Sequence, residues 1–197
     1  MLSGALPGKR RVIESLSASQ PVSWVEVMRL SGLPDYRAVD IALRTQIAGL
    51  KKVLQNAEFA LALERLSAKG QFVPPLEGRQ SPFLYAAVLG IFKKLGHDWV
   101  WVGDELCTER KLHWVDDLIK DPSVVGSPAN LFSPDKSLLW SVHWDSHFTF
   151  LCGSRSDLDR VDVSNRLEGF YCNSSTHVYW SVEDDSTTSA SDSKPTL

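Results

Sequence analysis

The spacing of apolar residues along the chain changes near residue 97. Upstream of that point, apolar side chains recur every three or four positions, a period typical of helices that bury one face. Several of these segments begin at a capping residue such as Asn56, or end at a glycine such as Gly70 or Gly96. Helices are therefore predicted at 23–32, 34–50, 56–70 and 81–95.

Downstream of residue 97 the pattern favours strands. The run "WVWV" is short, apolar and rich in β-favouring residues, which indicates a buried strand at 98–102. Helical spacing returns in "TERKLHWVDDLIKD", and alternating or short apolar runs mark the other strands. The further elements predicted are a helix at 108–121, strands at 137–152, 167–172 and 177–182, and a helix at about 156–166.

These elements define an α+β fold class, in which a helical N-terminal half packs on a mostly antiparallel sheet formed by the C-terminal half. The length of 197 residues suits a single α+β domain over 1–182, with a helical subregion at 1–70 and a sheet-rich subregion at 97–182. The last segment, 183–197, is polar, acidic and low in complexity, so we expect a disordered acidic tail there.

Charge is distributed unevenly along the chain. The formal net charge is −3, but residues 1–52 carry +4 and the remainder −7. An acidic body disfavours broad nucleic-acid binding, which needs clustered cations, and suits a basic protein partner. The longest apolar run, 83–92, is too short to span a bilayer, and the three cysteines are widely spaced. We therefore expect a soluble cytoplasmic protein with no membrane partner.

The segment "SLLWSVHWDSHFTFLCG", residues 137–153, holds two of the chain's five histidines. Its even-numbered positions from 138 to 152 are almost all apolar, whereas its odd-numbered positions are polar in the middle. This alternation predicts one buried strand face, provided that the strand continues over a bulge or turns over the three residues 144–146. A two-residue turn at 145–146 would destroy the alternation. We therefore expect His143 and His147 on one face.

Two interpretations of His143-x-Asp145-x-His147 remain open. In the first, the two imidazoles bind a divalent metal such as zinc, and Asp145 is a third ligand or orients one of them. In the second, the same side chains form the polar half of a strand and bond to each other and to neighbouring loops. A single motif of this kind does not decide between them.

The segment "GDELCTERKLHW", residues 103–114, concentrates charged side chains just beyond a predicted strand. If this loop faced the two histidines, Asp104 or Glu105 would complete an acid–base or metal cluster. The alternative is the solvated, charged start of a helix. No nucleophile-elbow pattern accompanies the cysteines, and the chain has no GxGxxG, P-loop or GxSxG motif.

Residues 22–50 have the size of a helix-turn-helix, with two helices joined by "SGLP". A recognition helix normally exposes a dense run of cationic or amide side chains. This one offers Arg37, Arg44 and Gln46 beside Asp35 and Asp40. A helical packing unit is therefore the favoured interpretation, and DNA binding is the alternative.

Three segments carry a resemblance to a known family: "WVWVGDELCTERKLHWVDDL", "LLWSVHWDSHFTFLCG" and "LEGFYCNSSTHVYWS". Over most of residues 20–182 the chain resembles a family of small bacterial proteins known only as a domain of unknown function, which implies no activity. In general character it is also similar to immunity proteins of polymorphic toxins, which are small, cytoplasmic, often acidic and rich in tryptophan. That similarity implies no site positions.

The function expected from these features is non-enzymatic binding of a protein, in the manner of an immunity protein that neutralises a basic toxin domain by direct contact. Acidic side chains would steer the partner and aromatic side chains would anchor it. The residues expected to bind are Asp104, Glu105, Trp144, Asp145 and His147. The alternatives are a metal-dependent hydrolase that uses His143, Asp145 and His147 and, more weakly, a helix-turn-helix DNA-binding regulator.

Overall fold

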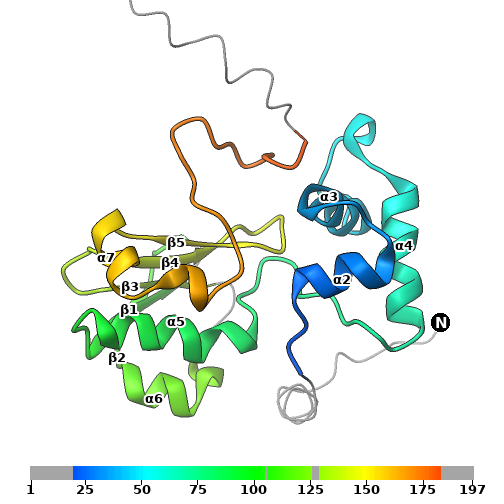
Figure 1. Cartoon of the computed structure of the whole chain (residues 1–197). Coiled ribbons are helices and arrows are strands. Elements are labelled where there is room, and N and C mark those ends of the chain that lie inside the picture. The colour runs from blue at the N-terminus through cyan, green and yellow to red at the C-terminus, as the bar shows by residue number, and fades with distance from the viewer. Residues whose placement is uncertain (1–19, 105, 126–128, 183–197) are drawn as a thin grey trace, which may run out of the picture. The chain divides into compact units, whose positions relative to one another are not determined.

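A computed structural model describes residues 20–104, 106–125 and 129–182 of the chain (Figure 1). It confirms the α+β fold class, with helices through the N-terminal half and a five-stranded antiparallel sheet in the C-terminal half. The described elements are α2 (Trp24–Ser31), α3 (Tyr36–Gln46), η1 (Lys52–Leu54), α4 (Ala57–Ala68), α5 (Pro82–Lys94), β1 (Trp99–Asp104), β2 (Arg110–Trp114), α6 (Val115–Lys120), η2 (Pro122–Val124), β3 (Ala129–Phe132), β4 (Leu139–Val142), β5 (Thr149–Cys152), α7 (Arg155–Arg160) and η3 (Val163–Asn165).

The chain divides into two compact units. Of the described residues, the helical unit contains 24–74 and 169–182, and the sheet unit contains 20–23 and the described part of 75–168. No helix in the described part of the chain is long and apolar enough to cross a membrane. The expected tail, 183–197, lies outside the described residues.

The helical unit is built on α2, α3 and α4, whose starts follow from local sequence. The Asp35 carboxylate accepts a hydrogen bond from the Ala38 amide at the start of α3, and the Asn56 side chain accepts one from the Phe59 amide at the start of α4. Such side-chain caps satisfy backbone donors that the first helical turn leaves unpaired. The apolar faces of the three helices then share one core: Val27, Ala38, Val39, Ala42, Leu43, Leu63 and Leu66.

A buried ionic network ties α3 to the C-terminal segment of the same unit. Arg44 is almost fully buried, its Nε lies 3.0 Å from Asp40 Oδ2, and its Nη2 donates to the Val178 carbonyl oxygen at 2.7 Å. The Ser181 hydroxyl donates to Asp40 at 2.5 Å, and the Arg44 guanidinium lies over the Tyr179 ring. Because each buried charge has a partner, residues 178–182 are held against α3.

The sheet unit is an antiparallel sheet in the strand order β2-β1-β3-β4-β5, and α5 runs alongside it (Figure 1). Its core gathers side chains of α5, α6 and the α7 region on one face of the sheet. Trp140 of β4 is fully buried there, and its ring contacts that of Tyr85 edge to face with centroids 5.0 Å apart. Burial raises the pKa of the Tyr85 phenol to about 12.

The predicted helix at 108–121 was wrong in its first half. Residues 110–114 form β2, which pairs antiparallel with β1, and α6 begins directly after it at Val115. The spacing of Leu112, Val115 and Leu118 resembles that of one continuous helix. The resemblance arises because strand β2 and helix α6 follow one another without a gap. The strands predicted at 167–172 and 177–182 were also wrong, since hydrogen-bonded turns occupy much of 173–182 and no strand is found there.

The ionic network yields the first prediction. Arg44→Ala should lower the free energy of unfolding by about 3–5 kcal/mol, because it leaves the Asp40 carboxylate buried without its cation. The matched control is Arg155→Ala, which breaks an exposed Arg155–Asp159 pair on α7 and should change stability by less than about 0.5 kcal/mol. Urea unfolding followed by circular dichroism measures both. Equal small effects for the two variants would contradict the role given to the network.

Candidate functional site

Two loops of interest lie at the same end of the sheet. Asp104, the last residue of β1, pairs with Ala129 at the start of β3, and Val142 at the end of β4 pairs with Thr149 at the start of β5. The β1–β2 turn and the β4–β5 connection therefore both leave this end, which we name the loop end. Their strands are separated by β3 alone, a spacing of about 10 Å.

The β4–β5 connection is a six-residue loop, 143–148, and neither a bulge nor a three-residue turn. Trp140 pairs with Leu151, so even-numbered residues of β4 share a face with odd-numbered residues of β5. The expectation of one apolar face through 138–152 was therefore wrong. Phe150 and Cys152 lie on the sheet face opposite Trp140, and the cysteine is exposed.

The loop 143–148 is fixed to the segment that precedes α5. The Gly78 amide donates to the Ser146 carbonyl oxygen at 3.0 Å, and His147 Nδ1 lies 2.9 Å from the Pro75 carbonyl oxygen. Ser146 is fully buried. Gly78 has a φ of +62°, and a Cβ added there would lie 2.7 Å from the Trp144 carbonyl oxygen. Only glycine allows the two backbones to approach so closely.

The two histidines have different surroundings. Because a carbonyl oxygen only accepts, His147 Nδ1 carries the hydrogen in its bond to Pro75, whereas His143 Nδ1 accepts from the Asp145 amide at 3.3 Å. The His143 ring also stacks on Phe148, with centroids 5.6 Å apart. Within the described ranges, no three His, Cys, Asp or Glu side chains are grouped to hold a metal ion. The metal set of His143, Asp145 and His147 stays a prediction.

Two large apolar side chains project from the loop end. Trp144 is 63% exposed and Leu106, in the β1–β2 turn, is 81% exposed. Asp104 lies at the base of that turn, where its carboxylate accepts hydrogen bonds from the Thr108 hydroxyl and amide and from the Glu109 amide. The Thr108 hydroxyl contributes most to lowering the Asp104 pKa, so the group is ionised at neutral pH. Glu105 lies outside the described residues.

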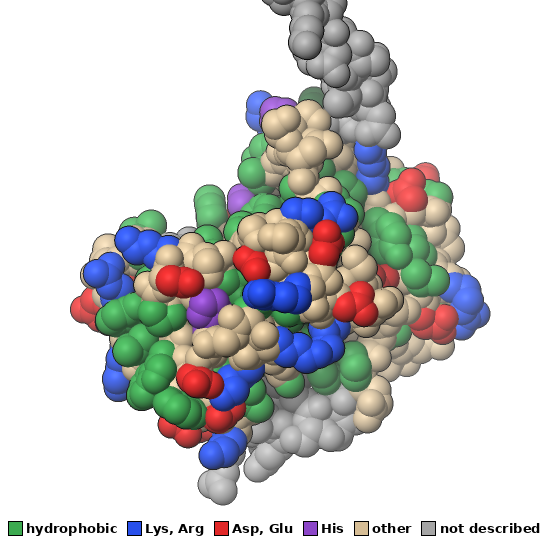
Figure 2. Space-filling model, turned by 60° about the vertical axis from the view of Figure 1, so that its left-hand side comes forward, with side chains coloured by type: hydrophobic (Ala, Val, Ile, Leu, Met, Phe, Trp, Pro, Cys, Tyr) green, Lys and Arg blue, Asp and Glu red, His purple; other side chains and the backbone are tan. Residues whose placement is uncertain are grey.

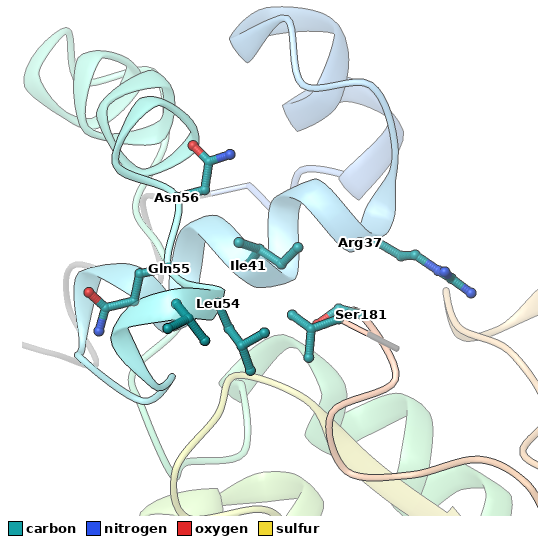
Figure 3. A pocket seen from close by; sticks show the side chains of 8 residues that line it. Arg37, Ile41, Leu54, Gln55, Asn56 and Ser181 are labelled. Atoms are coloured by element: carbon teal, nitrogen blue, oxygen red, sulfur yellow. The ribbon is translucent and has the colours of Figure 1, made fainter. Parts of the chain in front are cut away.

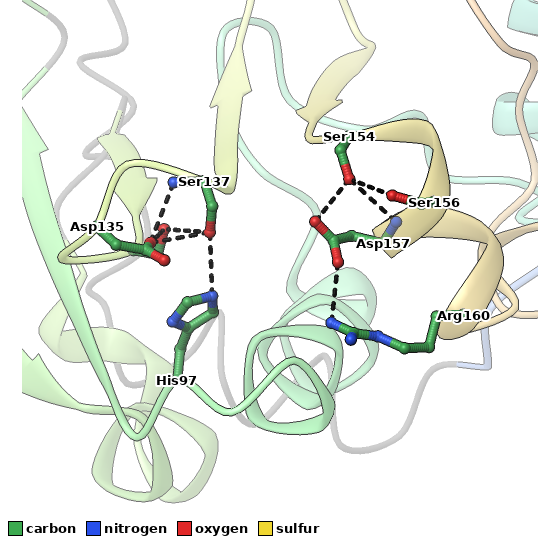
Figure 4. Close-up of polar contacts among 8 residues, drawn as sticks. His97, Asp135, Ser137, Ser154, Ser156, Asp157 and Arg160 are labelled. Carbon is green, nitrogen blue, oxygen red and sulfur yellow. Dashed lines mark hydrogen bonds and ion pairs between the residues drawn. The ribbon is translucent and has the colours of Figure 1, made fainter.

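Sequence reasoning missed a serine–histidine contact in the turn between β3 and β4 (Figure 4). Ser137 Oγ lies 3.3 Å from His97 Nε2 and donates to Asp135 at 2.8 Å, so the imidazole is the donor toward Ser137 and is not its base. Hydrogen bonds, led by the one from the Ser133 hydroxyl, lower the pKa of Asp135 to about 2. The arrangement is a turn held by a carboxylate and offers no activated nucleophile.

The helical unit has an open pocket of about 360 Å³ beside α3 and η1. Its lining combines aliphatic side chains such as Ile41 and Leu54 with Arg37, Gln55 and Asn56. Figure 3 shows the Arg37, Gln55 and Asn56 side chains pointing away from one another. The Gln55 and Asn56 side chains are also bonded to nearby backbone. Polar groups that do not converge give a ligand little specificity, so this pocket is not the candidate site.

The side chains of α3 argue against the helix-turn-helix interpretation. Arg44, one of the side chains expected to contact DNA, is buried in its pair with Asp40. Arg37 lines the pocket described above with Ser181. Cations that contact phosphates must reach the surface, so α3 presents a poorer recognition face than its sequence indicated. DNA binding by residues 22–50 stays an untested prediction.

The chain belongs to a family described as a protein of unknown function (DUF2711), whose model matches residues 6–182. The resemblance to a family of unknown function is thereby confirmed. No curated protein and no solved structure matches the chain. The family carries no activity to assign, so the loop end has to be interpreted from its own chemistry.

The close approach of Gly78 to the loop gives a second prediction. Gly78→Ala should lower the free energy of unfolding by about 2–3 kcal/mol, because the added methyl group meets the Trp144 backbone and the residue must keep a positive φ. The matched control is Gly96→Ala, at which φ is +92° and the methyl group would meet nothing within 4 Å. The free energy of unfolding should fall by a smaller amount in this control, about 1 kcal/mol, because only the positive φ is unfavourable for alanine. Equal losses in thermal unfolding would show that the loop contact contributes nothing.

Proposed function

We propose that this protein binds a basic protein partner through the loop end of its sheet, and that the partner is a toxin domain neutralised by direct contact. The observation that carries the proposal is the exposure of Trp144 on a loop fixed by the Ser146 and His147 contacts. Exposed tryptophans on rigid supports are frequent anchors of protein interfaces, because little entropy is lost when they become buried. Leu106 would add a second apolar anchor at the same end of the sheet.

The charges of the loop end support a basic partner. Asp104 is ionised, and Asp145 follows Trp144 directly in the loop. Acidic and basic side chains are interleaved over the face shown in Figure 2, which has no uniformly acidic surface. We expect the attraction to come from these two carboxylates of the loop end. Such groups mainly accelerate association, whereas buried aromatic contacts slow dissociation.

The hydrolase alternative has less to support it. His143 Nδ1 accepts a hydrogen bond from the Asp145 amide within the loop, whereas His147 Nδ1 donates to the Pro75 carbonyl oxygen outside it. No third ligand of the described chain is grouped with the two histidines. A catalytic metal usually takes three protein ligands and keeps one open position. Binding without catalysis therefore accounts better for the loop end.

The test uses the reading frame adjacent to this gene, if it encodes a basic toxin-like domain, as the candidate partner. Its product should arrest growth alone and not when this chain is co-expressed, and the two purified proteins should bind in calorimetry. Trp144→Ala should raise Kd about 30-fold, equivalent to about 2 kcal/mol. The matched control Trp99→Ala removes an exposed tryptophan at the opposite end of β1 and should leave Kd within about twofold.

Two outcomes would contradict the proposal. One is the absence of binding between the purified chain and the neighbouring product. The other is equal loss of binding in Trp144→Ala and Trp99→Ala, which would place the interface away from the loop end.

A further inference from the structure

The second face of the sheet, opposite α5, is mainly apolar, and none of its side chains belongs to the buried core clusters of the described residues. We name it the outer face; its side chains are Trp99, Trp101, Arg110, Leu112, Trp114, Asn130, Phe132, Leu139, Ser141, Phe150 and Cys152. None of these side chains is fully buried, and Trp99 and Leu112 are 44% and 39% exposed. A monomeric protein rarely leaves a contiguous apolar surface of this kind without a use for it.

Strand register arranges the outer face in rows. One row crosses all five strands and is apolar apart from its terminal thiol: Leu112, Trp101, Phe132, Leu139 and Cys152. The row nearer the loop end is polar at its centre, where the Ser141 hydroxyl bonds to Asn130 at 2.5 Å. Trp99 and Trp114 form a shorter row on the other side. The row that crosses all five strands is about 19 Å long.

Ligands that stack on aromatic rings fit this surface poorly. The Arg110 guanidinium lies over the Trp101 ring at 5.6 Å from its centroid, and the Lys93 ammonium lies over the Trp114 ring at 5.7 Å. The Trp99 and Trp114 rings meet at 90°. Bases and sugars need accessible, roughly parallel ring faces, and nucleic acid also needs several cations. Aliphatic side chains of a protein have no such requirement.

The charge and the dimensions of the outer face indicate which kind of protein segment would bind there. Among the outward-facing residues of the five strands, Arg110 alone carries a charge, so the occupant should present a carboxylate at that end. Along the strands, the three rows of residues make the outer face about 13 Å wide, close to the diameter of a helix. Across the strands, the face is about 19 Å long, which is the length of a helix of about 13 residues. The rectangle defined by these two dimensions has an area of about 250 Å². A second copy of the chain could bury little surface on it compared with the ~800 Å² per partner that a stable dimer buries.

We propose that the outer face docks an amphipathic helix of a partner protein, with apolar residues at intervals of three and four and an acidic residue at the end near Arg110. This surface is distinct from the loop end, and the proposal does not depend on the function proposed above. The helix would complete a three-layer arrangement by covering the sheet face opposite α5.

The test is a selection with a phage-displayed library of peptides of about 14 residues against the purified full chain. Enriched peptides should combine the helical apolar spacing with Asp or Glu at one end. In fluorescence polarisation, Arg110→Glu should weaken their binding at least about tenfold, and exchanging the peptide's acidic residue for Lys should restore it. Lys111→Glu makes the same charge change on the same strand toward the opposite face, and should alter binding less than about twofold.

Three results would overturn the proposal. The first is a selection that enriches no peptide of this pattern. The second is binding that Arg110→Glu and Trp101→Ala leave unchanged while both variants keep the thermal stability of the wild type. The third is concentration-dependent dimerisation in sedimentation that Leu112→Ser abolishes, which would assign the outer face to a second copy.

Discussion

Burial of one sheet face, and not of the other, is the constraint from which the rest of the sheet unit follows. Trp140, Leu131 and Val100 are fully buried on the face that α5 covers. Because side chains alternate along each strand, this burial sets the register of every strand and directs the intervening side chains to the outer face. Strand pairing then brings the β1–β2 turn and the loop 143–148 to one end.

The loop end and the outer face are neighbouring but chemically different surfaces. An aromatic series connects them, since His143 stacks on Phe148 and Phe148 contacts Phe150 edge to face at 5.1 Å. The loop end combines the carboxylates of Asp104 and Asp145 with an exposed Trp144. The outward-facing residues of the five strands are mainly apolar and include one charged residue, Arg110. Opposite local charges would let one small protein discriminate between a basic and an acidic partner.

The features that could be predicted from the sequence are those that depend only on residues close together in the chain, such as helix ends. Asn56 and Gly96 marked real helix ends, because caps and positive-φ glycines act within one turn. The faces of 138–152 could not be predicted, since their register depends on the contacts of Ser146 and His147 with residues about 70 positions earlier. Likewise, the C-terminal segment avoids a strand because Ser181 bonds to Asp40, 141 positions away. The motif His143-x-Asp145-x-His147 located the loop but not its geometry.

The central claim is that the loop end is rigid and displays Trp144 before any partner arrives. Backbone ¹⁵N relaxation over residues 143–148 of the free protein tests this claim most directly. The fixed loop predicts order parameters of about 0.85, equal to those of β4 and β5. Values below about 0.6 for Trp144 and Asp145 would describe a flexible loop and contradict the account.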